Sequence, residues 1–211
     1  MMPTPIDTIL AVCRPAVTRE QLRLPDLVSL AESITLTDAQ IELLCRPDLT
    51  QPYGRRVLLC EARLEVMVAT WSPGVLCAPH DHGGQIGAVR VLRGSTNHQI
   101  WSVADGRARC VREHEARRGE VLMAGPSLIH AMGCAGGKQS LVTLHLYTDA
   151  IPYMIVYDLP RGETVVVDST CGAWVPAPDT GQIISRLPGI WSRRAVIDWM
   201  DERGGSSHVV G

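Results

Sequence analysis

The stretch PHDHGGQIGAVRVLRG, residues 79–94, decides how the rest of the chain is interpreted. Its two histidines, His80 and His82, are one residue apart, and a run that alternates apolar and polar side chains follows the glycines. In a strand, residues i and i+2 point to the same face, with their Cα atoms about 7 Å apart. The two imidazoles can therefore bind one metal ion, and the alternating run predicts a half-buried strand.

Short segments of strand character follow one another from about residue 55. They are rich in β-branched residues, are separated by Gly, Pro or Asp, and include RVLLCEA, LEVMVATW, HQIWSVA, SLVTLHLY and TVVVDS. Many short strands at close spacing are typical of a β-sandwich or a small barrel. We therefore expect an all-β dominated fold, with a β-barrel over about residues 51–180.

The two ends of the chain are expected to be helical. TREQ (18–21) and TDAQ (37–40) match the capping-box pattern, and apolar residues recur at helical spacing after each, so that residues 18–47 are expected to form helices. Near the C-terminus, WSRRAVIDWMDERGG predicts a short helix. We expect one domain over residues 1–211, with a helical lobe at about 1–50 and a C-terminal extension that contains the short helix.

Composition excludes several classes of partner. The net charge is −2, which is not the basic balance expected of a nucleic-acid-binding protein. No apolar run reaches the roughly 18 residues of a membrane span, and the N-terminus has no basic region before its short apolar run, so we expect neither a membrane segment nor a signal peptide. Seven cysteines without a CxxC pair favour reduced thiols in the cytoplasm. We expect a monomer or a small homo-oligomer.

A third histidine extends the metal-binding hypothesis. His130 lies in GEVLMAGPSLIH, another strand-like segment. Three neutral imidazoles from two segments can form a facial site that leaves coordination positions open. Taken alone, an HxH pair is equally compatible with a surface or hydrogen-bonded pair of histidines. We expect His98 and His114 to face solvent, because their surroundings are polar, and Cys77 to point into the opposite layer, because it is out of phase with the HxH pair.

A second polar cluster occurs in SLVTLHLYTD. Strand alternation places Thr143, His145 and Tyr147 on one face, where a hydroxyl, an imidazole and a phenol can form a hydrogen-bond relay. The alternative interpretation of this cluster is a polar stripe on an exposed strand face.

The spacing of the glycines and histidines resembles the two cupin motifs. Gly74, five residues, and then the HxH pair and Gly94 are similar to the first motif, G(x)5HxH…G, and Gly119 with His130 eleven residues later is similar to the second. Most cupins supply a glutamate ligand within the first motif, at the position of Gly87. Together with the second polar cluster, the pattern from about Tyr53 to Asp158 resembles the cysteine dioxygenase (thiol dioxygenase) family.

This resemblance implies a cupin (jelly-roll) β-barrel with an N-terminal helical lobe, and an Fe(II) site with a hydrogen-bond relay beside it. The implied metal ligands are His80, His82 and His130. The implied catalytic relay is Thr143, His145 and Tyr147, with threonine in place of the usual serine. The implied substrate-binding residues are Arg55 on the substrate carboxylate, Tyr53 and Met154. Animal members carry a cysteine at the Gly87 position, cross-linked to the relay tyrosine, and Gly87 excludes that cross-link.

The resemblance further implies an iron-dependent enzyme that converts L-cysteine and dioxygen to cysteine sulfinate. Two alternatives stay open: a dioxygenase for 3-mercaptopropionate, which has the same carboxylate and thiol without the amine, and a non-catalytic metal-binding cupin. The expected partners are a small thiol and dioxygen.

Overall fold

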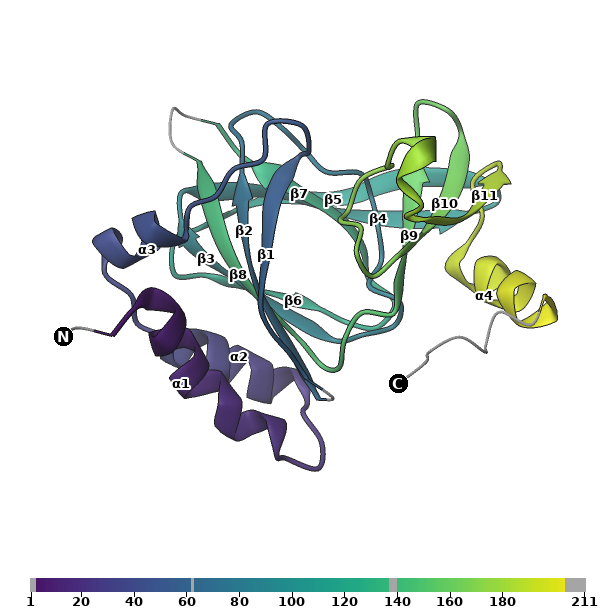
Figure 1. Ribbon diagram of the computed structural model, residues 1–211. Coiled ribbons are helices and arrows are strands. Elements are labelled where there is room, and N and C mark those ends of the chain that lie inside the picture. Colours follow the sequence, from purple (N-terminus) through teal and green to yellow (C-terminus); the bar gives the residue numbers. More distant parts are fainter. Residues whose placement is uncertain (1–2, 62, 137–139, 204–211) are drawn as a thin grey trace.

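The N-terminal helices gather on one side of the molecule in the computed structural model, which describes residues 3–61, 63–136 and 140–203 (Figure 1). They are α1 (Pro5–Val17), α2 (Leu24–Ser33) and α3 (Asp38–Leu44). Helix α3 begins at the expected capping box, in which Thr37 and Gln40 bind each other's backbone N–H groups. The other expected cap is wrong, since Thr18 ends α1 instead of starting a helix.

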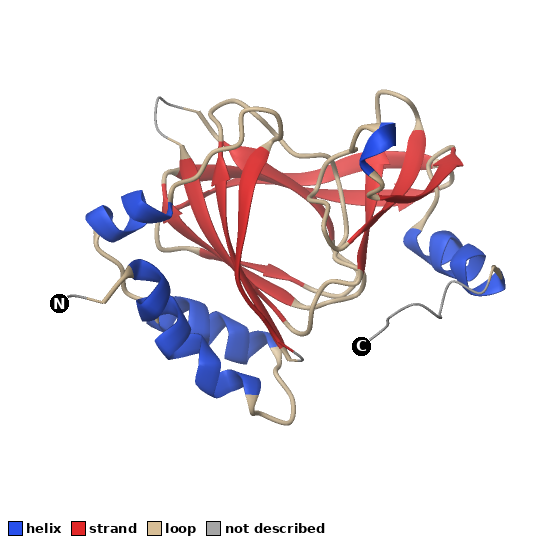
Figure 2. Cartoon of the chain, viewed as in Figure 1, coloured by secondary structure: helices blue, strands red, loops and turns tan. Residues whose placement is uncertain are grey.

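Strands are the largest class of regular structure, and they form three antiparallel sheets (Figure 2). The five-stranded sheet has the order β1 (Tyr53–Glu61), β2 (Leu64–Trp71), β8 (Leu141–Tyr147), β3 (Gly87–Arg93), β6 (Val121–Ala124). One three-stranded sheet has the order β5 (Arg107–Arg117), β4 (Ser95–Ala104), β7 (Ile129–Cys134). The other has the order β11 (Ile183–Pro188), β10 (Glu163–Asp168), β9 (Tyr153–Asp158). A 3₁₀ turn, η1 (Pro178–Thr180), precedes β11, and α4 (Arg193–Glu202) follows it.

The expected β-dominated fold with an N-terminal helical lobe is confirmed, but within the described residues the strand ladders do not close into a barrel. The segment that carries the HxH pair lies between the two smaller sheets and joins them by isolated bridges. The backbone N–H of His80 donates to the carbonyl of His130 in β7 (2.9 Å), and that of Tyr157 in β9 donates to the carbonyl of Pro79 (2.9 Å). This segment is therefore extended without being a regular strand.

Both faces of the five-stranded sheet are covered at its centre, because every residue of β2 is buried. Val66 and Val68 belong to the apolar cluster that α1–α3 form with the sheet, together with Ile9 and Leu27. The alternate residues of β2, which include Trp71, face the other way, into the space between the sheets. The helices therefore seal one face of the sheet and leave the other for the site described below.

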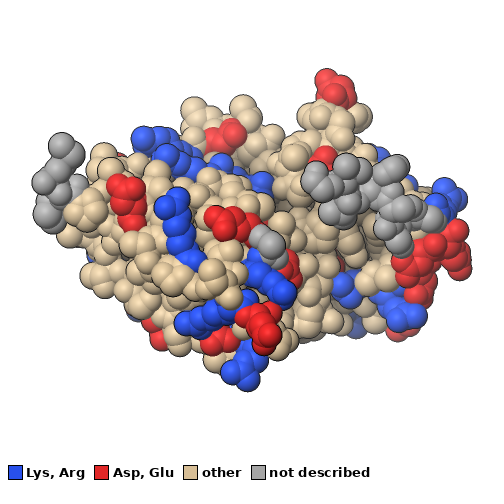
Figure 3. Space-filling model, turned by 60° about the horizontal axis from the view of Figure 1, so that its bottom comes forward, with Lys and Arg blue, Asp and Glu red and all other residues tan. Residues whose placement is uncertain are grey.

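The surface carries mixed charge. On the face shown in Figure 3, basic and acidic side chains are interspersed and do not gather into a large basic area. None of the described helices has the length and apolar character needed to cross a bilayer.

Candidate metal centre

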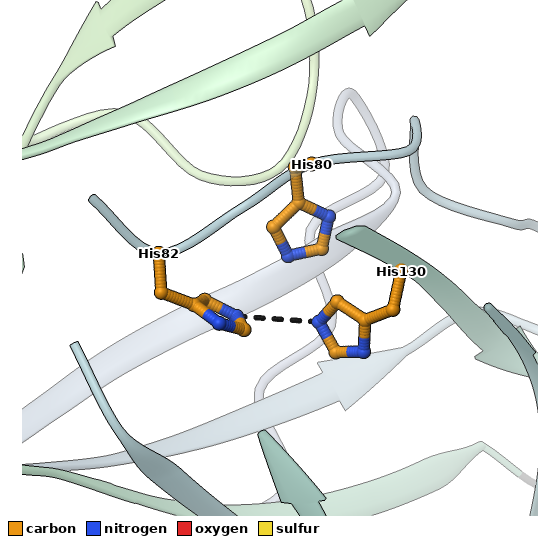
Figure 4. A group of neighbouring side chains, drawn as sticks. All are labelled: His80, His82 and His130. Atoms are coloured by element: carbon orange, nitrogen blue, oxygen red, sulfur yellow. Dashed lines mark hydrogen bonds between the residues drawn. The ribbon is translucent and has the colours of Figure 1, made fainter. Parts of the chain in front are cut away.

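Three buried histidine rings converge in the space between the sheets (Figure 4). His80 and His82 project from the extended segment and His130 projects from β7, and one ligand nitrogen from each lies within 4.8 Å of the others. The Nε2 atoms of His82 and His130 are 3.2 Å apart. Two nitrogens bound to one ion at about 2.1 Å and a right angle lie roughly 3 Å apart, so this spacing is that of a chelating pair. The group could hold a metal ion.

The outer ring nitrogens of His80 and His130 have hydrogen-bond partners that fit metal binding. Nδ1 of His80 lies 3.0 Å from the carbonyl oxygen of Ala78, which can only accept, so this nitrogen carries the proton. Nδ1 of His130 lies 2.8 Å from Nε2 of His98. When Nδ1 is the donor in both rings, each Nε2 presents a lone pair to the centre, as a metal ligand must.

Burial keeps the three rings neutral. It lowers the pKa of His80 to about 4. It also lowers the pKa of His82 and His130 well below the ordinary value, and the neighbouring rings lower both further. A metal ligand must be a neutral imidazole, and these histidines need no deprotonation at neutral pH to become one.

Two expectations about residues near this centre are wrong. His98 is 3% exposed and contacts His130, and its Nδ1 lies 3.5 Å from Nε2 of the half-buried His114. His98 is buried because β4 pairs with β7, a contact between distant segments that its polar sequence neighbours do not indicate. Cys77 does not point away either, since its Sγ lies 3.8 Å from Nδ1 of His80. Strand alternation does not apply there, because the segment before His80 is irregular.

A chain of hydrogen bonds leads along β8 to the three histidines. Oγ1 of Thr143 lies 2.8 Å from Nε2 of His145, and Nδ1 of His145 lies 3.0 Å from the hydroxyl of Tyr147. That hydroxyl lies 3.4 Å from Nε2 of His82. All three side chains are buried, so the sequence expectation that they share a face holds and an exposed polar stripe does not describe them.

Trp71 holds the first member of this chain in place. Its indole N–H, which can only donate, is 2.9 Å from Oγ1 of Thr143. The threonine hydroxyl keeps its own proton, with which it can donate to Nε2 of His145. In that arrangement the proton of the imidazole lies on Nδ1, which donates to Tyr147. The phenol proton is left to point toward the cavity. Burial raises the pKa of Tyr147 well above its ordinary value, so the phenol keeps this proton.

Gly87 makes room for Tyr147. The two residues are opposite each other in the β3–β8 ladder, and a Cβ atom at Gly87 would lie 2.5 Å from Cε1 of the tyrosine ring. The position at which most cupins supply a glutamate is therefore filled here by the ring of the relay tyrosine.

Arg55 reaches the same cavity from β1, and it is already paired. Its Nη2 donates to the carboxylate of Glu65 (2.8 Å), its Nη1 to the carbonyl of Ser169 (3.2 Å) and its Nε to Sδ of Met67 (3.2 Å). Glu65 is 3% exposed, and its other oxygen accepts the N–H of Ile151 (3.2 Å). Arg56 is not among the residues that line the cavity, as expected for adjacent strand positions.

The cavity in which these groups meet is small. The space open to the centre of a water molecule is about 20 Å³. Tyr53 and Met154, both expected to bind substrate, line it. The hydroxyl of Tyr53 accepts the N–H of Ala173 (2.9 Å), and its ring packs at 4.1 Å on that of Trp71, so its position is set by two contacts. The complete lining is Tyr53, Arg55, Met67, Trp71, His80, His82, His130, Met132, His145, Tyr147, Ile151, Met154 and Ser169.

Two residues that shape the site, Glu65 and Trp71, were missed in the sequence. Both lie on one face of β2, and register places Glu65 opposite Tyr147 of β8. The available signal was the single acidic residue in LEVMVATW, a segment otherwise apolar enough to be buried on both faces. A carboxylate in such a strand requires a partner, and the neighbouring strand offered Arg55 and Arg56, of which Arg55 is the one that pairs with Glu65.

Fold and site together define a β-rich cupin-type protein with a buried three-histidine group that could hold a metal. The chain belongs to the cysteine dioxygenase type I family, whose sequence model matches residues 4–159. The match begins well before Tyr53, where the resemblance noted above starts, and it includes the helical lobe.

Solved structures with a similar arrangement have low sequence identity. A Klebsiella pneumoniae protein with a double-stranded β-helix domain is 17% identical, with 59% of this chain and 96% of that chain covered and a TM-score of 0.45. An oxalate decarboxylase from Lactobacillus farciminis is 14% identical, with 53% of this chain and 33% of that chain covered and a TM-score of 0.44.

Proposed function

We propose that the protein is an iron-dependent thiol dioxygenase that converts L-cysteine and dioxygen to cysteine sulfinate. The observation that carries the proposal is the single cavity shared by three neutral histidines, a relay that ends in a phenol proton, and an arginine. Membership of the cysteine dioxygenase type I family supports the reaction class.

In this proposal His80, His82 and His130 hold Fe(II). The bound iron would supply a site at which a thiolate and dioxygen meet and through which electrons pass from sulfur to oxygen. Three imidazoles carry no charge, so they leave the full +2 charge of the ion to attract a thiolate. Imidazole and thiolate ligands both suit iron.

The side chains around the cavity would orient the substrate. Arg55 has five N–H groups, and its contacts with Glu65, Ser169 and Met67 use three of them, which leaves two for a substrate carboxylate. Tyr147 would donate its proton to an oxygen atom or to a polar group of the substrate, with the relay holding its hydroxyl in place. Tyr53 and Met154 would shape the wall against which the substrate packs.

Cysteine and 3-mercaptopropionate share the thiol and the carboxylate that these groups would bind, so the amine decides between them. Cysteine is the substrate we propose, and 3-mercaptopropionate is the nearest alternative. The second alternative is a cupin that binds a metal without catalysing a reaction. We further propose that residues 1–211 act as one domain in the cytoplasm, as a monomer or small homo-oligomer.

Oxygen uptake by the iron-loaded protein tests the proposal. Cysteine, 3-mercaptopropionate and cysteamine would be supplied in turn, and the sulfinate product measured. We expect uptake with cysteine and one sulfinate per dioxygen consumed. Faster uptake with 3-mercaptopropionate would show that this thiol, and not cysteine, is the substrate. Zinc in every preparation, together with no uptake with any thiol after iron loading, would favour a non-catalytic metal-binding cupin.

A further inference from the structure

Three histidines that belong to neighbouring strands form a line from the candidate metal centre toward the surface. They are His130 on β7, His98 on β4 and His114 on β5, in the sheet whose order is β5, β4, β7. His98 and His114 are directly opposite each other in the β4–β5 ladder. His130 is opposite Ile100, so it is the diagonal neighbour of His98 on the same face. The strand register alone brings the three rings together.

The contact between His98 and His130 is short and closed to water. The two nitrogens are 2.8 Å apart, and the exposed fractions of the residues are 3% and 2%. The second contact, between His98 and His114, is 3.5 Å and therefore weaker. His98 also packs edge-on against the His130 ring, with centroids 5.0 Å apart and an angle of 81° between the planes. A buried imidazole in this position fixes both the proton and the rotation of the ring beside it.

The proton positions follow from the donor and acceptor rules. A neutral imidazole carries one proton, and Nε2 of His130 must be bare if it is to bind a metal, so the proton of His130 is on Nδ1. Nε2 of His98 then accepts that proton, and the proton of His98 is on Nδ1, where it faces Nε2 of His114. His130 and His98 therefore each donate outward, away from the metal centre.

We propose that His98 is a positioning residue for the metal ligand His130, with His114 as a weaker support behind it. The inference rests on the proposed metal site. By accepting the Nδ1 proton, His98 holds His130 in the ligand tautomer and makes its Nε2 a stronger donor. Partners of this kind typically change metal affinity by about 10–100-fold when they are removed. His98 does not reach the cavity lining, so it acts through His130 alone.

Cobalt binding tests this role without any thiol or dioxygen. Co²⁺ would be titrated into the metal-free protein, with the dissociation constant and the visible ligand-field absorption as readouts. We expect His98→Leu to weaken Co²⁺ binding by about 10–100-fold and to alter the absorption, because His130 becomes free to rotate. His98→Gln supplies an amide oxygen as the acceptor and should recover most of the affinity. His114→Leu should weaken binding by less than about 10-fold.

Several outcomes would overturn the role of His98. One is His98→Leu binding Co²⁺ as tightly as the unsubstituted protein, and another is His98→Gln binding as weakly as His98→Leu. If His98→Leu does not fold, His98→Met replaces it, since a thioether of similar size to Gln is only a weak acceptor. If the unsubstituted protein binds no Co²⁺, both the proposed function and this inference are refuted. If all variants bind Co²⁺ tightly, only the inference is refuted.

Discussion

Replacing Arg55 by alanine should destabilise the protein, apart from any effect on substrate binding. The guanidinium is 2.8 Å from the carboxylate of Glu65, and the side chains are 19% and 4% exposed. Without Arg55, that carboxylate stays buried with the N–H of Ile151 as its remaining partner among the contacts described above. Removal of one member of a buried ion pair costs about 3–5 kcal/mol, because the other charge is left uncompensated. Water can reach the Arg55 side of the pair, so we expect a value near the lower end, about 3 kcal/mol.

A double substitution separates the unpaired charge from lost packing. Arg55→Ala combined with Glu65→Gln removes both charges and keeps an oxygen that can accept the N–H of Ile151. If the loss comes from the buried charge, the double variant should recover at least about 1.5 kcal/mol relative to Arg55→Ala, an interaction energy typical of contacting residues. Arg56→Ala is the matched control and should change stability by less than about 0.5 kcal/mol.

Urea denaturation followed by tryptophan fluorescence measures these differences through the midpoint and slope of the transition. An Arg55→Ala variant as stable as Arg56→Ala would refute the reasoning, because Glu65 would then not depend on the arginine. Losses in Arg55→Ala and Glu65→Gln that simply add in the double variant would refute it as well. The comparison matters for function, since reduced turnover of Arg55→Ala reports a lost substrate anchor only after partial unfolding has been excluded.

Three other perturbations have outcomes that the structure predicts. Gly87→Ala places a methyl group 2.5 Å from the Tyr147 ring and should cost about 1–3 kcal/mol of stability and slow oxygen uptake, whereas Gly125→Ala, with open space around it, should be silent in urea denaturation and in uptake assays. Trp71→Phe removes the N–H that holds the Thr143 hydroxyl and should slow uptake about tenfold with metal content unchanged, and equal rates would show that the relay does not depend on the indole. Burial lowers the pKa of His145 from 6.5 to about 3, so the unfolded chain binds this proton more readily and the stability of the metal-free protein should fall as pH drops below about 6.5. His145→Gln should make that slope shallower without abolishing it, because the buried His80, His82 and His130 contribute in the same direction, as measured by urea denaturation at several pH values.

Local patterns predicted the parts of the site that depend on one segment. Period-two alternation placed Thr143, His145 and Tyr147 on one face, and the structure shows them hydrogen-bonded in that order. The HxH spacing predicted that His80 and His82 point the same way, and their rings lie 5.1 Å apart. Short-range geometry decides these relations, so one sequence is enough to state them.

Relations between distant segments could not be predicted in the same way. His98 was expected to face solvent because its sequence neighbours are polar, yet the pairing of β4 with β7 brings it within 2.8 Å of His130. Glu65 lies ten positions from Arg55, and only the β1–β2 ladder shows that they meet. Helix α1 lies within the expected helical lobe, but its capping box pairs Thr4 with Asp7, where the usual pattern has Glu or Gln, so the pattern did not locate its start.

The charges around the cavity explain why a metal ion matters for substrate capture. Arg55 is the charged residue of the lining, and Glu65 behind it supplies one negative charge, so the pair is neutral as a unit. Burial lowers the pKa of His145 to about 3 and raises the pKa of Tyr147, which keeps the imidazole and the phenol uncharged. A small thiol that also carries a carboxylate brings one or two negative charges into this space when its sulfur ionises. The protein groups can hydrogen-bond the carboxylate, but they supply no net positive charge to stabilise the thiolate, so in the proposed function that charge would come from the ion held by the three histidines.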